Sequence, residues 1–319
     1  MNLMKTTALA ALLVGSLTLA GSAIGQDKTY TIGVSVPTAD HGWTGGVDFF
    51  AQQAVDRLGK AYPNVKFVLA TAPDSTKQAA DLEDMVTTRN IDGLVILPGD
   101  PDAMTASIKK VKDAGKWVTV VDRALSQPGI QDLYVAGDNP GLGATTAAYF
   151  KKALPNGGNI VVLRGAPIPI DKQRVDAFMA GIEGTNIKVL DSQFANWNRD
   201  DGYKIMQDFL TKYPKIDAVW AQDDDTLVGV LKALKEAGRD KDTWSVGGAG
   251  MNQMIKLVAA GSTEVPVDVS YNPNMVATAI DLTTLHFVAG SQVDGNFIIN
   301  STLITKDNAA QFDYANTPF

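Results

Sequence analysis

Apolar segments of strand length alternate with amphipathic helical patterns along almost the whole of this 319-residue chain. Near-continuous apolar runs such as Leu94–Leu97 and Ile160–Leu163 are typical of parallel strands that are covered by helices on both faces. The first series of predicted strands comprises Tyr30–Val36, Val65–Ala70, Gly93–Leu97, Trp117–Val121 and Leu133–Ala136. The second series comprises Asn159–Leu163, Ile187–Leu190, Ala218–Ala221, Thr243–Gly247 and Val265–Val269. Two series of similar length predict an α/β protein with two doubly wound parallel-sheet lobes.

Helical patterns fill the intervals between these predicted strands. They include Thr44–Leu58, Thr76–Arg89, Asp171–Gly184, Arg199–Tyr213, Asp224–Ala237 and Met275–Gly290. Three glycines that follow helical patterns suit helix ends, because glycine adopts the left-handed conformation without strain. They are Gly115, Gly184 and Gly238. The aromatic residues for which we expect a structural role are Trp117, Trp220, Trp244 and His286.

The N-terminal segment has the pattern of a secretory signal. Lys5 gives it a basic start, an apolar run extends from Ala8 to Ala20, and Ala23 and Gly25 are small residues. This pattern predicts export with cleavage after Gly25, with Ala23 as the near alternative, and the apolar run is shorter than a typical membrane span. The chain has no Cys, which excludes both a lipid-anchored cysteine and disulfide bonds.

Charge and motif content argue against several other function classes. The formal net charge of −7 at pH 7 argues against nucleic acid as a partner, which would require a basic face. The sequence has no Gly-x-Ser-x-Gly elbow, no Gly-x-x-x-x-Gly-Lys loop and no His-Glu-x-x-His. We therefore expect a binding protein rather than an enzyme, with no catalytic residues and no cofactor.

Side chains suited to a small polar ligand follow the predicted strands. Asp40, His41 and Trp43 follow the first strand, and Asp122 and Arg123 follow the fourth. Candidates in the second series are Arg174, Trp197, Asp223 and Tyr271. Because open α/β sheets bind ligands at the carboxyl ends of their strands, we expect these side chains to converge. Charged groups for hydroxyls and ring faces for C–H groups together suit a polyhydroxylated molecule.

The acidic run Asp223–Asp225 permits two interpretations. Three neighbouring carboxylates could hold a metal ion, or they could accept hydrogen bonds from the free N–H groups at the start of the following helix. Capping is the commoner role. We therefore expect Asp223 to face the ligand, the other two residues to cap the helix, and no metal to be bound.

His41 is the one candidate that titrates near neutral pH. A neutral imidazole both donates and accepts a hydrogen bond, whereas the protonated ring only donates. If a ligand hydroxyl donates to His41, binding is expected to weaken as the pH falls through the imidazole range.

Several motifs together resemble the periplasmic sugar-binding proteins of the ribose-binding type. They are Leu94–Pro98, Val120–Arg123, Ala136–Asn139 leading into Gly143, Asp171–Phe178 and Ala221–Asp224. Each motif is weak alone, but their shared order and spacing cover essentially the whole mature chain. The resemblance implies a type I periplasmic binding fold and ligand contacts from His41, Trp43, Asp122, Arg123, Arg174, Trp197 and Asp223, with Asp40 adjacent.

The chain departs from the ribose-binding pattern at positions near the implied ligand. Leu97 stands where that pattern has a polar amide, Ala249 where it has an aspartate, and Tyr271 where it has a glutamine. The loop His41–Trp43 replaces a loop with adjacent aromatic residues. These changes favour a different pentose, a ketose or a linear sugar alcohol over ribose.

The resemblance also implies how the protein works. We expect an N-terminal lobe of residues 26–137 plus 272–301 and a C-terminal lobe of residues 138–271 plus 302–319, after a signal of residues 1–25. A monomeric periplasmic protein would close these lobes around a sugar or sugar alcohol and deliver it to an ABC permease in the inner membrane. One alternative is a sensor that docks on a receptor kinase or chemoreceptor. A DNA-binding regulator is disfavoured, because the signal is present and an N-terminal helix-turn-helix is missing.

Overall fold

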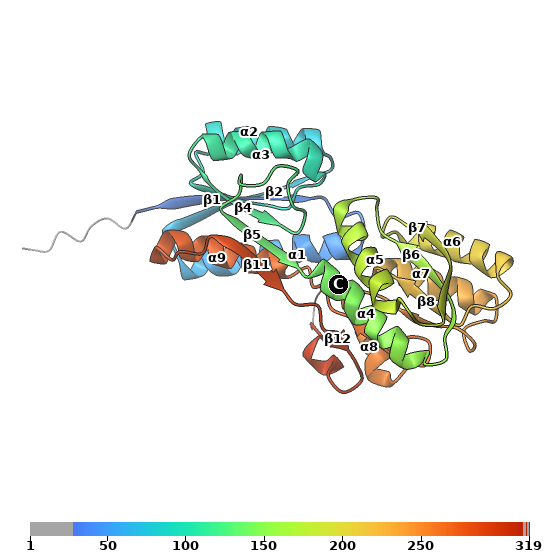
Figure 1. The fold of residues 1–319 in the computed structure, drawn as a ribbon. Helices are drawn as coiled ribbons and strands as arrows, with labels where there is room; N and C mark the ends of the chain where they lie inside the picture. The colour runs from blue at the N-terminus through green and yellow to red at the C-terminus, as the bar shows by residue number, and fades with distance from the viewer. Residues whose placement is uncertain (1–27, 315–316, 318) are drawn as a thin grey trace, which may run out of the picture.

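A six-stranded parallel sheet forms the core of the first lobe (Figure 1). This computed structural model describes residues 28–314, 317 and 319, so the predicted signal at residues 1–25 lies outside the described residues. The strand order is β11–β5–β4–β3–β1–β2. The strands are β1 (Tyr30–Pro37), β2 (Val65–Ala72), β3 (Gly93–Ile96), β4 (Trp117–Val121), β5 (Leu133–Gly137) and β11 (Gly295–Ile299). Helices α1 (Gly42–Ala61) and α9 (Met275–Ala289) cover one face of this sheet, and α2 (Ser75–Thr87) and α3 (Pro101–Asp113) cover the other.

The second lobe contains a four-stranded parallel sheet with the order β7–β6–β8–β9. Its strands are β6 (Gly158–Arg164), β7 (Ile187–Phe194), β8 (Ala218–Ala221) and β9 (Trp244–Val246). Helices α4 (Asn139–Ala153) and α5 (Pro169–Ile182) pack together, as do α6 (Arg199–Lys212) and α7 (Asp224–Glu236), and α8 (Asn252–Ala260) follows β9. The predicted fold class, an α/β protein with two doubly wound parallel sheets, is confirmed.

The segment Val265–Val269 differs from the parallel strand predicted there. Only β10 (Asp268–Val269) is a strand, and it pairs antiparallel with β12 (Leu303–Ile304). Pro266 accounts for the difference, because proline has no N–H to donate within a sheet. Strands β11 and β12 were not predicted. Strand β11 lies at the edge of its sheet with most of its side chains exposed, and β12 is only two residues long.

The chain passes between the two sheets three times, after β5, before α9 and after β11. These crossings are joined by backbone hydrogen bonds. Asp138 N donates to Ile299 O (2.9 Å), and Ser270 N donates to Thr302 O (2.9 Å). The two lobes are therefore connected by three chain segments that hydrogen-bond to one another.

Helix ends and core residues follow the sequence patterns closely. Gly115, Gly184 and Gly238 have φ of 76°, 74° and 65°, in the left-handed region after α3, α5 and α7. Trp220 is fully buried and stacks on Phe178 with ring centroids 4.3 Å apart. Of the helices in the described part of the chain, none combines the length and apolarity needed to cross a bilayer.

Candidate functional site

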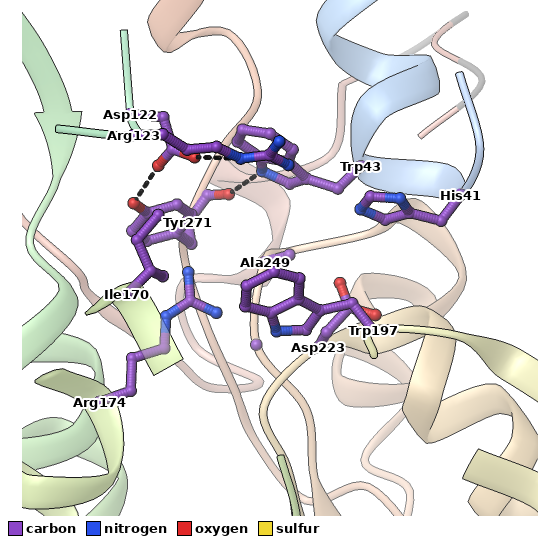
Figure 2. A pocket seen from close by; sticks show the side chains of 11 residues that line it. His41, Trp43, Asp122, Arg123, Ile170, Arg174, Trp197, Asp223, Ala249 and Tyr271 are labelled. Carbon is purple, nitrogen blue, oxygen red and sulfur yellow. Dashed lines mark hydrogen bonds and ion pairs between the residues drawn. The ribbon is translucent and has the colours of Figure 1, made fainter. Parts of the chain in front are cut away.

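A cavity of about 370 Å³, counted with its open mouth, lies where loops from both lobes meet (Figure 2). The first lobe supplies residues that follow β1 and β4, and the second lobe supplies residues from α5 and from the loops after β7, β8 and β9. The lining consists of His41, Trp43, Asp122, Arg123, Ile170, Arg174, Trp197, Asp223, Gly248, Ala249 and Tyr271. The strand ends of both sheets therefore converge as expected for this fold class.

His41 is held at the cavity wall by a small polar cluster. Its Nδ1 lies 2.5 Å from Asp40 Oδ1, and the Thr44 hydroxyl donates to the same carboxylate oxygen (2.8 Å). Burial works against the charged imidazole, but the hydrogen bond with Asp40 and the charges of Asp223, Asp40 and Asp225 outweigh it. The pKa of His41 therefore lies above its ordinary value. The bond with His41 lowers the pKa of Asp40 to about 2, so Asp40 is a carboxylate that orients the ring.

Trp43 forms the apolar wall on the first lobe. Its side chain is 6% exposed, and its indole Nε1 donates to Tyr271 O (2.9 Å). A buried indole whose only polar atom is already bonded presents carbon surface to the cavity. The bond also ties the first ligand loop to the crossing segment before α9.

Asp122 and Arg123 follow β4 directly. Asp122 has a φ of 61°, a strained conformation for a residue with a side chain and one that clusters at functional sites. Its Oδ1 accepts a hydrogen bond from the Tyr271 hydroxyl (2.5 Å). Arg123 Nη1 donates to the carbonyl oxygens of Gly99 (2.5 Å) and Pro98 (3.2 Å), whereas its buried Nε has no partner. A buried donor without a partner is costly, so this Nε is well placed for a ligand oxygen.

Arg174 and Trp197 form the facing wall from the second lobe. Arg174 donates through Nε to Asn139 Oδ1 (2.8 Å) and through Nη1 to Gln222 O (3.2 Å). The Trp197 backbone is left-handed, with φ of 52°, and a Cβ at Gly165 would overlap its indole ring. The indole is thus braced from behind, and the free part of the Arg174 guanidinium lies beside it in the cavity.

The run Asp223–Asp225 departs from the expected division of roles. Asp223 lines the cavity and also caps α7, since its carboxylate accepts from Thr226 N (3.1 Å). Asp224 does not cap that helix: it accepts from Gly248 N, Gly250 N and Met251 N and so shapes the loop after β9. Burial, countered in part by the His41 charge, raises the pKa of Asp223 to about 7.

Asp225 reaches across to the first lobe instead of capping α7. Its Oδ2 accepts from Gly42 N at the start of α1 (2.6 Å), and its Oδ1 accepts from Arg199 Nη2 (2.6 Å). A Cβ at Gly42 would overlap the Asp225 carboxylate, so any larger residue there would displace that carboxylate from Gly42 N. Among the described residues this is the only direct hydrogen bond between the lobes away from the crossing segments.

Every residue that the sequence suggested for the ligand site lines this cavity except Asp40, which stands behind His41. Sequence reasoning missed Ile170 and Gly248 in the lining, and it treated Ala249 only as a departure from a pattern. Nothing in an isolated isoleucine or glycine signals a ligand site. Leu97, another departure, is fully buried and does not line the cavity. Over residues 28–314, 317 and 319, no His, Asp or Glu side chains cluster as metal ligands would.

Comparisons with known proteins agree with this architecture. The ribose import binding protein RbsB of Escherichia coli (strain K12) is 28% identical over 307 residues, which cover 96% of this chain and 100% of the relative. The xylitol-binding protein of Mycolicibacterium smegmatis is 28% identical over 296 residues, which cover 91% and 81% of the two chains. A solute-binding protein from Bacillus halodurans, solved with bound myo-inositol, has a TM-score of 0.81 at 24% identity, over 91% of this chain and 99% of that chain.

The structural likeness establishes the type I periplasmic binding fold. The family model described as "Periplasmic binding protein domain" matches residues 32–286, a range that runs through both sheets. The chain therefore belongs to the periplasmic binding protein domain family.

Proposed function

We propose that this protein is a periplasmic solute-binding protein that captures a sugar or sugar alcohol and delivers it to an ABC permease. The observation that carries this proposal is the composition of the interlobe cavity. Two indole rings, from Trp43 and Trp197, come from opposite lobes, and charged side chains line the same cavity around them. Ring faces bury the C–H groups of a polyhydroxylated molecule, while the charged groups bond its hydroxyls.

The polar atoms left free in the cavity fit hydroxyl groups. Arg123 Nε is a donor without a partner, and Asp122 Oδ2 is an acceptor 4.0 Å from it. Each hydrogen bond to a charged group contributes roughly 1.5–3 kcal/mol net. A few of these, together with burial of one ring face, reach the approximately −8 kcal/mol of micromolar binding.

The mechanism that we propose is hinge closure about the three crossings. The lobe bounds that we propose are residues 26–137 plus 272–301 and residues 138–271 plus 302–319. Trp43, Asp122 and Arg123 then belong to one lobe and Arg174 and Trp197 to the other, so the full set of contacts exists only when the lobes are together. Such differential contact is what a ligand needs to shift a two-state equilibrium.

The proposed ligand class follows from the names of similar proteins and from the positions at which this chain departs from the ribose-binding pattern. Proteins similar to this chain are named for ribose and xylitol, and one similar structure holds myo-inositol. Tyr271 and Ala249 line the cavity where the ribose-binding pattern has polar side chains. We therefore propose a pentose other than ribose, a ketose or a linear sugar alcohol as the ligand.

The remaining parts of the proposal concern the protein's location, oligomeric state and docking partner. We propose export through the N-terminal signal, a periplasmic location and a monomeric state, with no nucleic-acid partner and no catalytic activity. The permease is the proposed docking partner. The sensor alternative differs only in that partner, a receptor kinase or chemoreceptor.

A thermal-shift screen of pentoses, hexoses, ketoses and sugar alcohols tests the proposed function. A ligand present at 100 times its dissociation constant stabilises the native state by about 2.7 kcal/mol. We expect at least one compound to raise the melting temperature, and calorimetry to give a stoichiometry of one. If no compound in the screen shifts the melting temperature, the sugar-binding proposal is wrong. Uptake of the bound compound by vesicles that contain the permease separates transport from sensing.

A further inference from the structure

Two buried carboxyl groups of the second lobe lie outside the cavity lining. Asp224, the first residue of α7, is 1% exposed, and Asp268, the first residue of β10, is fully buried. Among the described residues, the buried aspartates that have a cationic partner are Asp122, Asp171 and Asp225. Asp224 and Asp268 are therefore buried acids that no cation neutralises, which is a costly arrangement unless a proton is shared.

The Asp224 carboxylate holds the loop that forms one wall of the cavity. Its Oδ1 accepts from Gly248 N (3.0 Å), and its Oδ2 accepts from Gly250 N (3.0 Å) and Met251 N (2.7 Å). Gly248 and Ala249 of this loop line the cavity (Figure 2). Ala249 has a φ of 139°, a strained conformation that persists only where the surroundings impose it. The position of this wall therefore depends on Asp224.

Asp268 approaches the same loop from β10. Its Oδ1 accepts from Val269 N (2.8 Å), whereas its buried Oδ2 receives no hydrogen bond from an N–H or O–H group of the described residues. Strand β10 is joined to the loop, since Ala249 N donates to Val269 O (2.8 Å). The Asp268 side chain is also in hydrogen-bonding contact with Asp224. Such a bond requires a proton on one of the two groups, because an ionised carboxylate only accepts.

The proton of this pair resides on Asp268. Burial raises the pKa of Asp268 well above its ordinary value, and the charge of Asp224 raises it further. Burial raises the pKa of Asp224 as well, but the N–H groups of Met251 and Gly248 counter that effect by stabilising the ionised form. Two carboxyl groups in contact cannot both ionise easily. Asp268 is thus the donor and Asp224 the acceptor.

The elements packed against the pair supply no opposing charge. On α7, Asp223 and Asp225 stand on either side of Asp224 and are negative when ionised. Helices α4 and α8 and strand β12 contact β10, and their buried residues include no Asp, Glu, Lys, Arg or His. The charged side chains on or next to these elements are exposed or half-buried: Lys151, Lys152, Lys256, Glu264, Lys306 and Asp307. A second ionisation is therefore opposed by burial and by negative charge together.

From these contacts we propose that Asp268 is a positioning residue, which stays protonated at neutral pH, donates to Asp224 and so holds the loop 248–251 as a wall of the cavity. Ionisation of Asp268 would set two carboxylates against each other and loosen that loop. The carboxyl pair is a property of the protein with or without ligand. Its effect on binding rests on the proposed sugar-binding function.

The first test needs no ligand and compares the parent with Asp268→Asn. The amide keeps a donor for Asp224 and an acceptor for Val269 N but does not ionise. In infrared spectra at pH 7, the carbonyl stretch of protonated carboxyl groups should be weaker in Asp268→Asn by the intensity of one group. Asp242→Asn is the matched control, since Asp242 is exposed in the turn before β9. The control should keep the parent's spectrum.

Urea unfolding at several pH values gives a second readout without ligand. An aspartate with a raised pKa in the native state stabilises the fold at low pH, and this advantage is lost as the pH rises from about 3.9 through the native value. Relative to Asp268→Asn, the folding equilibrium constant of the parent should fall about tenfold per pH unit for as long as Asp268 holds its proton. Asp242→Asn should follow the parent.

Ligand binding tests whether the pair positions the cavity wall. At pH 7, Asp268→Asn should bind the tightest ligand of the screen like the parent, because the donor is kept. Asp268→Ala removes the donor and leaves Asp224 without it, so we expect the dissociation constant to rise at least about tenfold in calorimetry. Circular dichroism checks that this variant is folded. If it is not, the infrared and unfolding measurements decide with Asp268→Asn alone.

Three results would overturn the inference. One is equal intensity of the protonated-carboxyl band in the parent and Asp268→Asn, and another is the same pH dependence of unfolding in both proteins. The third is a folded Asp268→Ala variant that binds like the parent, which would show that the pair does not position the wall. A screen that finds no ligand would overturn the sugar-binding function instead, and the two measurements without ligand would still decide whether Asp268 holds the proton.

Discussion

The hydrogen bond between Gly42 N and Asp225 Oδ2 makes a sharp test of hinge closure, because it joins the lobes without lining the cavity. The bond is 2.6 Å long, and the Asp225 side chain is only 7% exposed. When the lobes separate, Gly42 N and the Asp225 carboxylate return to water. The carboxylate also lies at the N-terminus of α1, where helix dipoles favour negative charge.

Asp225→Ala should therefore weaken ligand binding without touching the ligand. A hydrogen bond to a charged group contributes roughly 1.5–3 kcal/mol, and each 1.4 kcal/mol is a factor of ten in affinity. We expect the dissociation constant to rise about 10- to 100-fold, mostly through a faster off-rate. Losing the ion pair with Arg199 adds little, because that side chain is half exposed and surface pairs contribute about 0–1 kcal/mol.

Stopped-flow fluorescence of the cavity tryptophans gives the off-rate for the tightest ligand of the screen, and calorimetry gives its affinity. Asp200→Ala is the matched control, since Asp200 is an exposed acid in the first turn of α6. The control should bind like the parent. Parent-like affinity and off-rate in Asp225→Ala, with the fold intact by thermal melting, would refute a role for this bond in closure.

Three further predictions concern the cavity itself. Trp43→Ala and Trp197→Ala should each weaken binding more than tenfold in calorimetry while thermal melting shows a folded apo protein; unchanged affinity in both variants would exclude stacking. Arg123→Lys should bind the ligand more weakly than the parent protein does, because lysine cannot place one donor beside Asp122, as the buried Nε of Arg123 does, and another on the backbone carbonyls that anchor Nη1. Parent-like affinity in this variant would contradict that geometry. Affinity for the same ligand should be tighter at pH 6 than at pH 8, which calorimetry at the two pH values checks directly.

Apolar patterning predicts the framework of this fold because burial decides the pattern. The strands at Trp117–Val121 and Ala218–Ala221 have the predicted bounds, since helices cover both of their faces and every residue but Trp117 is buried. The same reasoning failed at Val265–Val269, where Pro266 removes a backbone donor from an otherwise apolar run. Hydrophobicity alone does not register that loss.

The site was predictable to the extent that fold topology brings strand ends together. Asp122, Arg123 and Trp197 follow strands, and the topology alone brings them to one cavity. The roles of Asp224 and Asp225 were not predictable, because both depend on backbone N–H groups distant in sequence. Gly42 in particular lies 183 residues from Asp225 and in the other lobe. No local pattern encodes such a contact.

The environment of His41 changes the pH dependence expected from sequence alone. A histidine that merely accepts a ligand hydroxyl would lose affinity on protonation. Here the Nδ1 is engaged by Asp40, and the carboxylates of Asp223 and Asp225 approach from the opposite lobe. Burial disfavours the imidazolium, yet these carboxylates raise the pKa of His41 above its ordinary value. We therefore expect closure to take up protons rather than to release them.

The pKa of Asp223 is also raised, but mainly by burial rather than by neighbouring charges. Burial raises its pKa to about 7 in this structure, in which the lobes are in contact, whereas a carboxyl group in water titrates near 3.9. A pKa raised on closure favours the closed state at low pH, and that advantage is lost as the pH rises through about 7. Between pH 8 and pH 6 the linkage at Asp223 alone strengthens closure by up to about tenfold. Asp223→Asn should remove most of this dependence, and calorimetry in buffers of different ionisation enthalpy should show proton uptake on binding by the parent. Binding without proton uptake would show that Asp223 and His41 stay solvated when the lobes close.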